Sequence, residues 1–166
     1  MSEQEIQEME DRARQEVEDL RSGIHNEYTK IYVDGCFDLV HSGHYHHIMK
    51  SKQRGDWLVA GINSDEDVMN HKGPTILNLD ERAEILRHCK YVDEVVTKVP
   101  YAANIETLKS YGCQFYAHGD DPCLDEDGVD VMLDLRKAGM YIEIPRIAGI
   151  STTDITGRLL EKIDEP

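Results

Sequence analysis

The segment from residue 31 to residue 44, IYVDGCFDLVHSGH, constrains the fold more than any other part of this chain. Its β-branched and aromatic start predicts a strand over residues 30–34. We expect this strand to break at Gly35, because only a residue without Cβ lets the backbone turn sharply or approach a ligand closely. A helix should follow from about Gly43 to Gln53. A strand, a glycine turn and a helix N-terminus together predict a phosphate-binding corner.

Strand-like and helix-like segments alternate through the rest of the chain. Further strands are predicted at 57–62, 94–96, 114–117 and 141–144, helices at 65–69, 78–88, 104–111, 129–138 and from 151, and loops at 70–74 and 118–128. The alternation predicts an α/β fold of the Rossmann-like, doubly wound type, with a mainly parallel five-stranded sheet and helices on both faces. Ligands of such sheets bind beyond the C-terminal ends of the strands.

The first 24 residues differ from this pattern. Apolar side chains recur at helical spacing on a strongly acidic background, which predicts an acidic helical N-terminal extension over residues 1–24. We expect a helix packed on the domain or on a partner, or a partly disordered arm. A membrane-surface helix is disfavoured because its polar face should be basic. The remainder, residues 30–162, is predicted to form one domain.

Charge and cysteine content limit the possible partners. The formal net charge of −15 argues against a general nucleic-acid or anionic-membrane surface. The acidic N-terminus has no secretory pattern, and no apolar run approaches the length of a membrane span. The four cysteines are widely spaced, so we expect reduced thiols and a cytoplasmic location.

Two histidines bracket a glycine in His41-Ser-Gly-His44, just after the predicted strand and turn. We interpret both as ligand-binding groups at the phosphate corner, and the alternative is a pair of capping or core histidines. A zinc site is a further alternative, because His46, His47 and Cys36 are close in sequence. No additional ligand with standard spacing is visible, so we predict no metal site.

Cationic and hydroxyl side chains follow the other predicted strands. Lys72 precedes Gly73-Pro74 in a loop that could close over phosphates. The segment from Arg146 to Thr153 predicts a second phosphate cradle, although part of it must serve as an ordinary helix cap. The segment from His118 to Asp121 suits a polar or cationic ligand, and the alternative is a solvated acidic loop.

These segments together resemble the cytidylyltransferases, within the wider group of nucleotidyltransferases that carry His-x-Gly-His. The resemblance covers residues 30 to 160 and rests on six segments: 35–38, 41–44, 71–73, 80–82, 91–95 and 149–153. Within the family it is strongest to the ethanolamine-phosphate enzymes, through residues 71–74, 99–102 and 118–123.

The resemblance implies a reaction in which CTP and phosphoethanolamine give CDP-ethanolamine and pyrophosphate, a step in phosphatidylethanolamine biosynthesis. The acceptor phosphate would attack the α-phosphorus of CTP in line, without a covalent enzyme intermediate. Mg²⁺ would be carried on CTP and would need no dedicated protein ligands.

The resemblance also implies roles for individual residues. The catalytic residues would be His41, His44, Lys72 and Arg146. CTP would be bound by Gly35, Cys36, Phe37, Asp38, His41, Gly43, His44, Arg82, His118, Gly119, Asp120, Arg146, Gly149, Ile150, Ser151, Thr152 and Thr153. The acceptor would be bound by Asp34, Lys72, Tyr101, Asp120 and Asp121.

Two departures from the family pattern qualify these expectations. Ile147 stands where the family usually has Thr, which removes one hydroxyl donor to CTP and predicts a reduced affinity. The ethanolamine enzymes usually contain two such domains in tandem, so this domain would be part of such a chain or would form a homodimer through residues 91–95. The alternative functions are a choline-phosphate or glycerol-3-phosphate cytidylyltransferase, or a non-catalytic CTP-binding domain.

Overall fold

The computed structural model describes residues 4, 7, 11 and 28–164. Apart from those first three positions, the predicted N-terminal extension over residues 1–24 lies outside the described residues. The sheet has five strands, in the order β3-β2-β1-β4-β5, and every neighbouring pair is parallel. The strands are β1 (Lys30–Gly35), β2 (Trp57–Ile62), β3 (Glu94–Thr97), β4 (Phe115–Gly119) and β5 (Tyr141–Ile144). The predicted α/β, Rossmann-like sheet is therefore confirmed.

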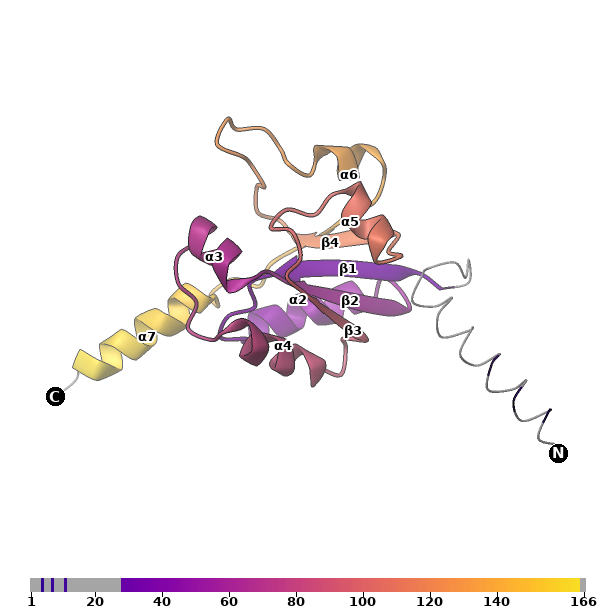
Figure 1. The fold of residues 1–166 in the computed structure, drawn as a ribbon. Coiled ribbons are helices and arrows are strands. Elements are labelled where there is room, and N and C mark those ends of the chain that lie inside the picture. Colours follow the sequence, from indigo (N-terminus) through magenta and orange to yellow (C-terminus); the bar gives the residue numbers. More distant parts are fainter. Residues whose placement is uncertain (1–3, 5–6, 8–10, 12–27, 165–166) are drawn as a thin grey trace.

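Helices cover both faces of this sheet (Figure 1). They are α2 (Ser42–Lys52), α3 (Asp65–His71), α4 (Leu79–Arg87), α5 (Ile105–Ser110), α6 (Leu133–Lys137) and α7 (Thr152–Asp164). Figure 1 shows α5 and α6 on one side of the strands and α2 and α4 on the other. The last helix, α7, extends away from the sheet.

Each face of β1 contributes to its own hydrophobic core, because successive side chains of a strand point to opposite faces. Ile31 packs with residues that include Ile48 of α2 and Leu86 of α4. Tyr32 packs on the other face with residues that include Leu108 of α5 and Leu135 of α6. A central parallel strand buried on both sides explains why the strand sequences are almost continuously apolar.

The strand order places a topological switch point at β1. The chain runs from β1 through β2 to β3 on one side, and then returns to place β4 and β5 on the other. Ile31 pairs with Leu58 of β2 and with Phe115 of β4. In such sheets the crevice beyond the C-terminal ends of the two central strands is the usual ligand site.

Most predicted boundaries agree with the structure to within two residues, but the helix predicted over 129–138 does not. It begins at Leu133, because carboxylates hold the preceding residues in a turn. Asp125 Oδ1 accepts hydrogen bonds from the Asp127 and Val129 N–H groups, and Asp130 Oδ1 accepts one from Met132 N–H. In addition, α3 continues to His71 rather than ending at Met69, so the loop begins at Lys72.

None of the helices in residues 28–164 combines the length and apolar character needed to cross a membrane. All four cysteines are free thiols, and Cys89 and Cys113 are buried. A cytoplasmic location stays a prediction.

Candidate functional site

The turn that follows β1 is built from non-glycine residues. Phe37 and Leu39 have φ angles of 52° and 48°, in the left-handed region that L-residues with side chains rarely adopt. The strand ends at Gly35, as predicted, but Gly35 has no positive φ, so the residues after it make the turn. A Cβ at Gly35 would lie 3.6 Å from Phe37 Cε2, which is ordinary contact. Surrounding contacts must therefore hold the turn in place.

Arg82 supplies several of those contacts from beneath the turn. Its side chain has no solvent exposure. Nη1 donates to the carbonyl of Cys36 at 2.6 Å, Nη2 donates to the carbonyl of Asn63 at 3.0 Å, and Nε donates to the carbonyl of Leu77 at 3.2 Å. Nη2 also pairs with Asp65 Oδ1 at 2.6 Å. The structure thus places Arg82 inside the fold as a support of the corner, although the sequence predicts it as a CTP ligand.

Asp38 links the corner to two other segments. Its carboxylate accepts hydrogen bonds from Ile76 N–H at 2.7 Å and Leu77 N–H at 3.0 Å. Its main-chain carbonyl accepts a hydrogen bond from Thr152 Oγ1 at 3.1 Å. Two residues from the predicted CTP set, Asp38 and Thr152, therefore bind each other.

The two predicted histidines lie together at the start of α2. His41 is the N-cap, and its Nδ1 accepts a hydrogen bond from Gly43 N–H at 3.0 Å. His44 Nδ1 accepts a hydrogen bond from His41 N–H at 3.2 Å. The capping interpretation is therefore correct for both Nδ1 atoms. Because Nδ1 accepts, the proton of each neutral ring is assigned to Nε2, which leaves an N–H donor on each ring for a ligand.

Burial keeps these rings neutral at pH 7. Burial lowers the pKa of His44 to about 4, and the neighbouring His41 and His47 add to the effect. The pKa of His41 is also lowered, again by burial. Each ring is therefore a neutral hydrogen-bond donor in the free protein. An arriving phosphate would favour the protonated form, because an opposite charge nearby raises the pKa of a histidine.

The start of α2 and the segment before α7 lie against each other at Gly43. A Cβ on Gly43 would lie 2.8 Å from His41 Cε1 and 3.2 Å from Ile150 Cγ2, so a side chain there would need the neighbouring atoms to shift. Gly149, next to Ile150, has a φ of 83°. Ser151 Oγ accepts a hydrogen bond from Asp154 N–H at 3.1 Å and caps α7. The structure thus brings together the two segments that the sequence predicts as phosphate cradles.

Asp121 and Arg146 follow the ends of β4 and β5. The Arg146 guanidinium forms an ion pair with the carboxylate of Asp121. A Cβ on Gly119 would lie 3.4 Å from Arg146 Nε, so glycine leaves room for the arginine to lie over this strand end. Arg146 remains accessible, with 64% of its side chain exposed. Asp120 is also exposed, and Asp121, predicted to bind the acceptor, is occupied with Arg146 here.

A buried carboxylate lies at the end of β1. Asp34 Oδ1 accepts a hydrogen bond from the Tyr116 hydroxyl at 2.7 Å, whereas Asp34 Oδ2 is buried without a hydrogen-bond partner. Burial raises the pKa of Asp34 to about 7, against the opposing effects of Tyr116 and the charge of Lys72. Lys72 is the C-cap of α3 and is exposed. A carboxylate oxygen that lacks a donor is the group that a cationic ligand could satisfy.

Another predicted acceptor residue, Tyr101, lies within electrostatic range of this carboxylate. Its ring stacks on His71 with a centroid separation of 3.8 Å. Burial raises the pKa of Tyr101, and Cys36 and Asp34 contribute in the same direction. Tyr101 and Lys72 therefore both lie within electrostatic range of Asp34 at the end of β1.

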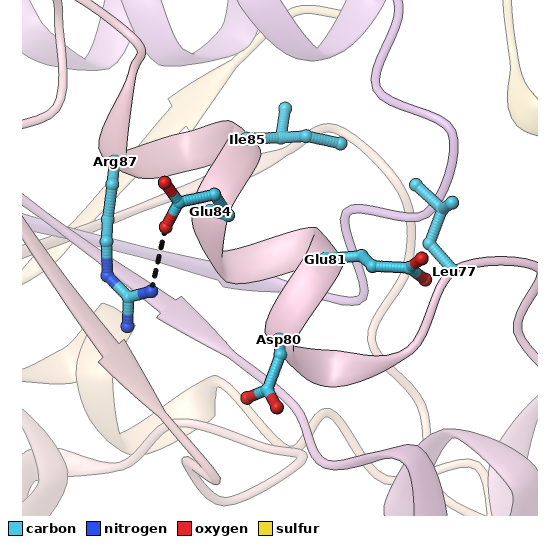
Figure 2. Close-up of a pocket in the computed structure, with 6 residues that line it drawn as sticks. All are labelled: Leu77, Asp80, Glu81, Glu84, Ile85 and Arg87. Atoms are coloured by element: carbon cyan, nitrogen blue, oxygen red, sulfur yellow. Dashed lines mark hydrogen bonds and ion pairs between the residues drawn. The ribbon is translucent and has the colours of Figure 1, made fainter.

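A separate hollow of about 540 Å³ lies along α4 (Figure 2). It is lined by Leu77, Asp80, Glu81, Glu84, Ile85 and Arg87. Its arginine is paired with Glu84 at 3.4 Å, so the lining is acidic and would repel a triphosphate. In the described part of the chain, no group of three or more His, Cys, Asp or Glu side chains is placed to hold a metal ion.

Sequence reasoning missed two partners of the site. Tyr116 is predicted only as a strand residue, yet it orients Asp34. His47 of α2 is half-buried, and this burial lowers its pKa to about 4, with the charge of His118 as the next cause. The available signal is a polar ring at a position of a strand or helix that should be apolar.

Comparisons with known proteins identify the family of this chain. The family model described as Cytidylyltransferase-like matches residues 32–158. The chain is 40% identical over 131 residues to an ethanolamine-phosphate cytidylyltransferase from Mus musculus, and this match covers 79% of this chain and 32% of the relative. It is 39% identical over 137 residues to choline-phosphate cytidylyltransferase A from Homo sapiens, covering 81% of this chain and 37% of the relative. The chain thus spans about a third of the length of these two curated relatives.

A solved structure supports the fold. It is that of the lipopolysaccharide core biosynthesis protein from Thermoplasma volcanium, which superimposes with a TM-score of 0.58 at 24% identity. The superposition covers 75% of this chain and 99% of that one. The family match over most of the chain leads to one conclusion: the chain belongs to the cytidylyltransferase-like family.

Proposed function

We propose that this domain transfers a cytidylyl group from CTP to phosphoethanolamine, giving CDP-ethanolamine and pyrophosphate. The observation that carries the choice of acceptor is the buried carboxylate of Asp34, whose Oδ2 has no hydrogen-bond partner. A primary ammonium can donate a hydrogen bond to this oxygen, whereas a trimethylammonium has no N–H to donate. An anionic glycerol phosphate has no cation for it at all. Lys72 stands close enough to lower the pKa of Asp34, so it could bind the phosphate end of the same molecule.

In the proposed reaction an oxygen of the acceptor phosphate attacks the α-phosphorus of CTP. The new P–O bond forms as the bond from the α-phosphorus to the β-phosphate oxygen breaks, and the electron pair leaves with pyrophosphate. The chain contributes position and charge stabilisation. His41 and His44 would donate Nε2–H hydrogen bonds to phosphate oxygens, and Arg146 and Lys72 would neutralise the developing charge.

The proposal includes Mg²⁺, which would be bound to the triphosphate of CTP. The described residues offer no cluster of three or more potential ligands, so its ligands would be phosphate oxygens and water. It would supply charge neutralisation on the triphosphate. The remaining charge would fall to Arg146, Lys72 and the histidines.

Pairing with a second such domain is also part of the proposal, either in a homodimer or in a tandem chain. The segment from Tyr91 to Val95 leads into β3, which is an edge strand and so has an open side. The carboxylates of this segment are already paired within the domain, Asp93 with Lys52 at 2.6 Å and Glu94 with Lys30 at 3.8 Å. A partner would therefore contact the apolar side chains of the segment rather than its charges.

The test is pyrophosphate release from CTP with three acceptors: phosphoethanolamine, phosphocholine and glycerol 3-phosphate. We expect the highest kcat/KM with phosphoethanolamine. The control is His44→Ala, which should lower kcat by roughly 100- to 1,000-fold while CTP still binds. A clear preference for glycerol 3-phosphate would exclude the proposed acceptor. If parent and variant both bind CTP and neither releases pyrophosphate, the domain is a CTP-binding module.

A further inference from the structure

The end of α3 is joined to the loop after β3 by a ring stack. The rings of His71 and Tyr101 lie parallel, with centroids 3.8 Å apart and an angle of 7° between their planes. His71 Nδ1 lies 2.7 Å from the carbonyl of Asp67, one helical turn earlier. Nδ1 therefore carries the proton and donates, which fixes the orientation of the imidazole. His71 itself is exposed, so this contact is not a consequence of burial in the core.

The residue that follows His71 is Lys72, whose charge acts on the buried carboxylate of Asp34. Lys72 caps the C-terminus of α3, and its charge acts on Asp34, Cys36 and His44. The charges of Cys36 and Asp34 contribute to raising the pKa of the Tyr101 hydroxyl. One helix end thus holds a cation directly and an aromatic ring through a stack, and both lie within electrostatic range of Asp34.

We propose that His71 is a positioning residue for the acceptor. It holds the Tyr101 ring in a fixed relation to Lys72, so that the ammonium end and the phosphate end of one acceptor molecule meet a single rigid unit. This inference rests on the proposed function, because it assumes an acceptor that carries both groups. The ring of Tyr101 would contact the ammonium, as aromatic faces do with cations.

The chemistry predicts which property of His71 matters. If the stack positions Tyr101, an aromatic substitute should retain the effect, and a substitute that keeps only an N–H donor should lose it. His71→Phe keeps a ring of similar size but has no donor for the Asp67 carbonyl. His71→Gln keeps a donor but has no ring. A contact that serves only the stability of α3 would give the opposite order, because the hydrogen bond lies within that helix.

Pyrophosphate release by the full chain and these variants tests the proposal. We expect His71→Gln to raise KM for phosphoethanolamine by about five- to ten-fold, with KM for CTP within about two-fold of the parent. His71→Phe should stay within about three-fold of the parent. In a Tyr101→Ala background, His71→Gln should have no further effect on KM for phosphoethanolamine. Equal shifts in both KM values, or an undiminished effect of His71→Gln in the Tyr101→Ala background, would overturn the proposal.

Calorimetric titration of phosphoethanolamine into the free protein separates this inference from the proposed function. If the parent binds phosphoethanolamine, His71→Gln weakens binding and His71→Phe does not, the positioning role holds even where no pyrophosphate is released. That outcome overturns only the proposed reaction. If the parent neither binds phosphoethanolamine nor releases pyrophosphate with it, both proposals fail. If the parent binds and all His71 variants bind equally, only the positioning role fails.

Discussion

Arg82 Nη1 donates a hydrogen bond to the main-chain carbonyl of Cys36 at 2.6 Å, from a side chain with no solvent exposure. This contact fastens the turn after β1 to α4, 46 residues further along the chain. Arg82 therefore acts on the site through the main chain of this turn. Its removal should affect the fold first and nucleotide binding second.

Replacing Arg82 tests that order. Arg82→Ala leaves the carbonyls of Cys36, Asn63 and Leu77 without their donor, so we expect a loss of about 3–5 kcal/mol in unfolding free energy. Urea denaturation measures it. The matched control is Arg87→Ala on the same helix, where an exposed pair with Glu84 should contribute at most about 1 kcal/mol. If Arg82→Ala is as stable as the parent but binds CTP more weakly, Arg82 contacts CTP directly.

Gly43 should be intolerant of even a methyl group. Gly43→Ala places a Cβ against His41 Cε1 and Ile150 Cγ2, so one of the two predicted phosphate-binding segments must move. We expect kcat/KM for CTP to fall on the order of 100-fold, because small misplacements of positioned groups have effects of this size. The control is Gly157→Ala in α7, where no atom lies within 4 Å of the new Cβ. Parent-like activity of Gly43→Ala would show that the two segments are not required to be in contact.

Acid should destabilise the fold through its buried histidines. The pKa of His47 is about 4 in the folded protein, against an ordinary 6.5, so between these values only the unfolded chain takes up the proton. Stability is complete above pH 6.5 and is lost as the pH falls toward 4, by up to about 3 kcal/mol. The positive charges of His118, Arg146 and His46 oppose protonation of His47, whereas a hydrogen bond with the Ala117 backbone favours it.

His47→Gln isolates this effect. Urea denaturation between pH 4 and 7 should give a shallower dependence for His47→Gln than for the parent. His88→Gln is the control for a histidine replacement at the surface, because the His88 side chain is 76% exposed. Identical slopes for the parent and His47→Gln would mean that the folded protein accommodates the protonated ring.

Asp34 should show the opposite pH dependence. Its folded pKa of about 7 lies above the ordinary 3.8, so the folded state binds the extra proton and stability falls as the pH rises from 4 to 7. At pH 8 Asp34→Asn removes a buried charge, and we expect a higher melting temperature than that of the parent. KM for phosphoethanolamine should rise roughly 10- to 100-fold, since a charged hydrogen bond is lost. Asp127→Asn, in an exposed loop, should change neither quantity.

Much of the sheet was predictable from local pattern. The apolar run from Trp57 to Ile62 fits a central parallel strand, and the structure gives the same bounds. The helices predicted from residues 65 and 78 begin at Asp65 and Leu79, because the side-chain oxygens of Ser64 and Asn78 each accept a hydrogen bond from an N–H three residues later. These features depend on neighbours in the sequence, which is the information that a sequence displays.

The features that could not be predicted depend on distant partners. Phe37 and Leu39 adopt left-handed backbone conformations that only the surrounding contacts can enforce, so the sequence points to Gly35 instead. The burial of Arg82 follows from carbonyls contributed by three separate segments. The stack of His71 on Tyr101 joins residues that no local period relates. In each case the deciding partner lies far along the chain.

The strand order described above has a consequence for how the molecule folds. Pairing of β1 with β4 joins segments about 84 residues apart, as in the hydrogen bond from Lys30 N–H to Gln114 Oε1, whereas β1, β2 and β3 follow one another along the chain. Closing that long loop is the most non-local step of assembly, and non-local pairing is slow. In the sequence, His41 and His44 lie before β4, and Arg146 lies after β5. The predicted phosphate-binding corner is therefore completed only when the second half of the sheet has joined the first.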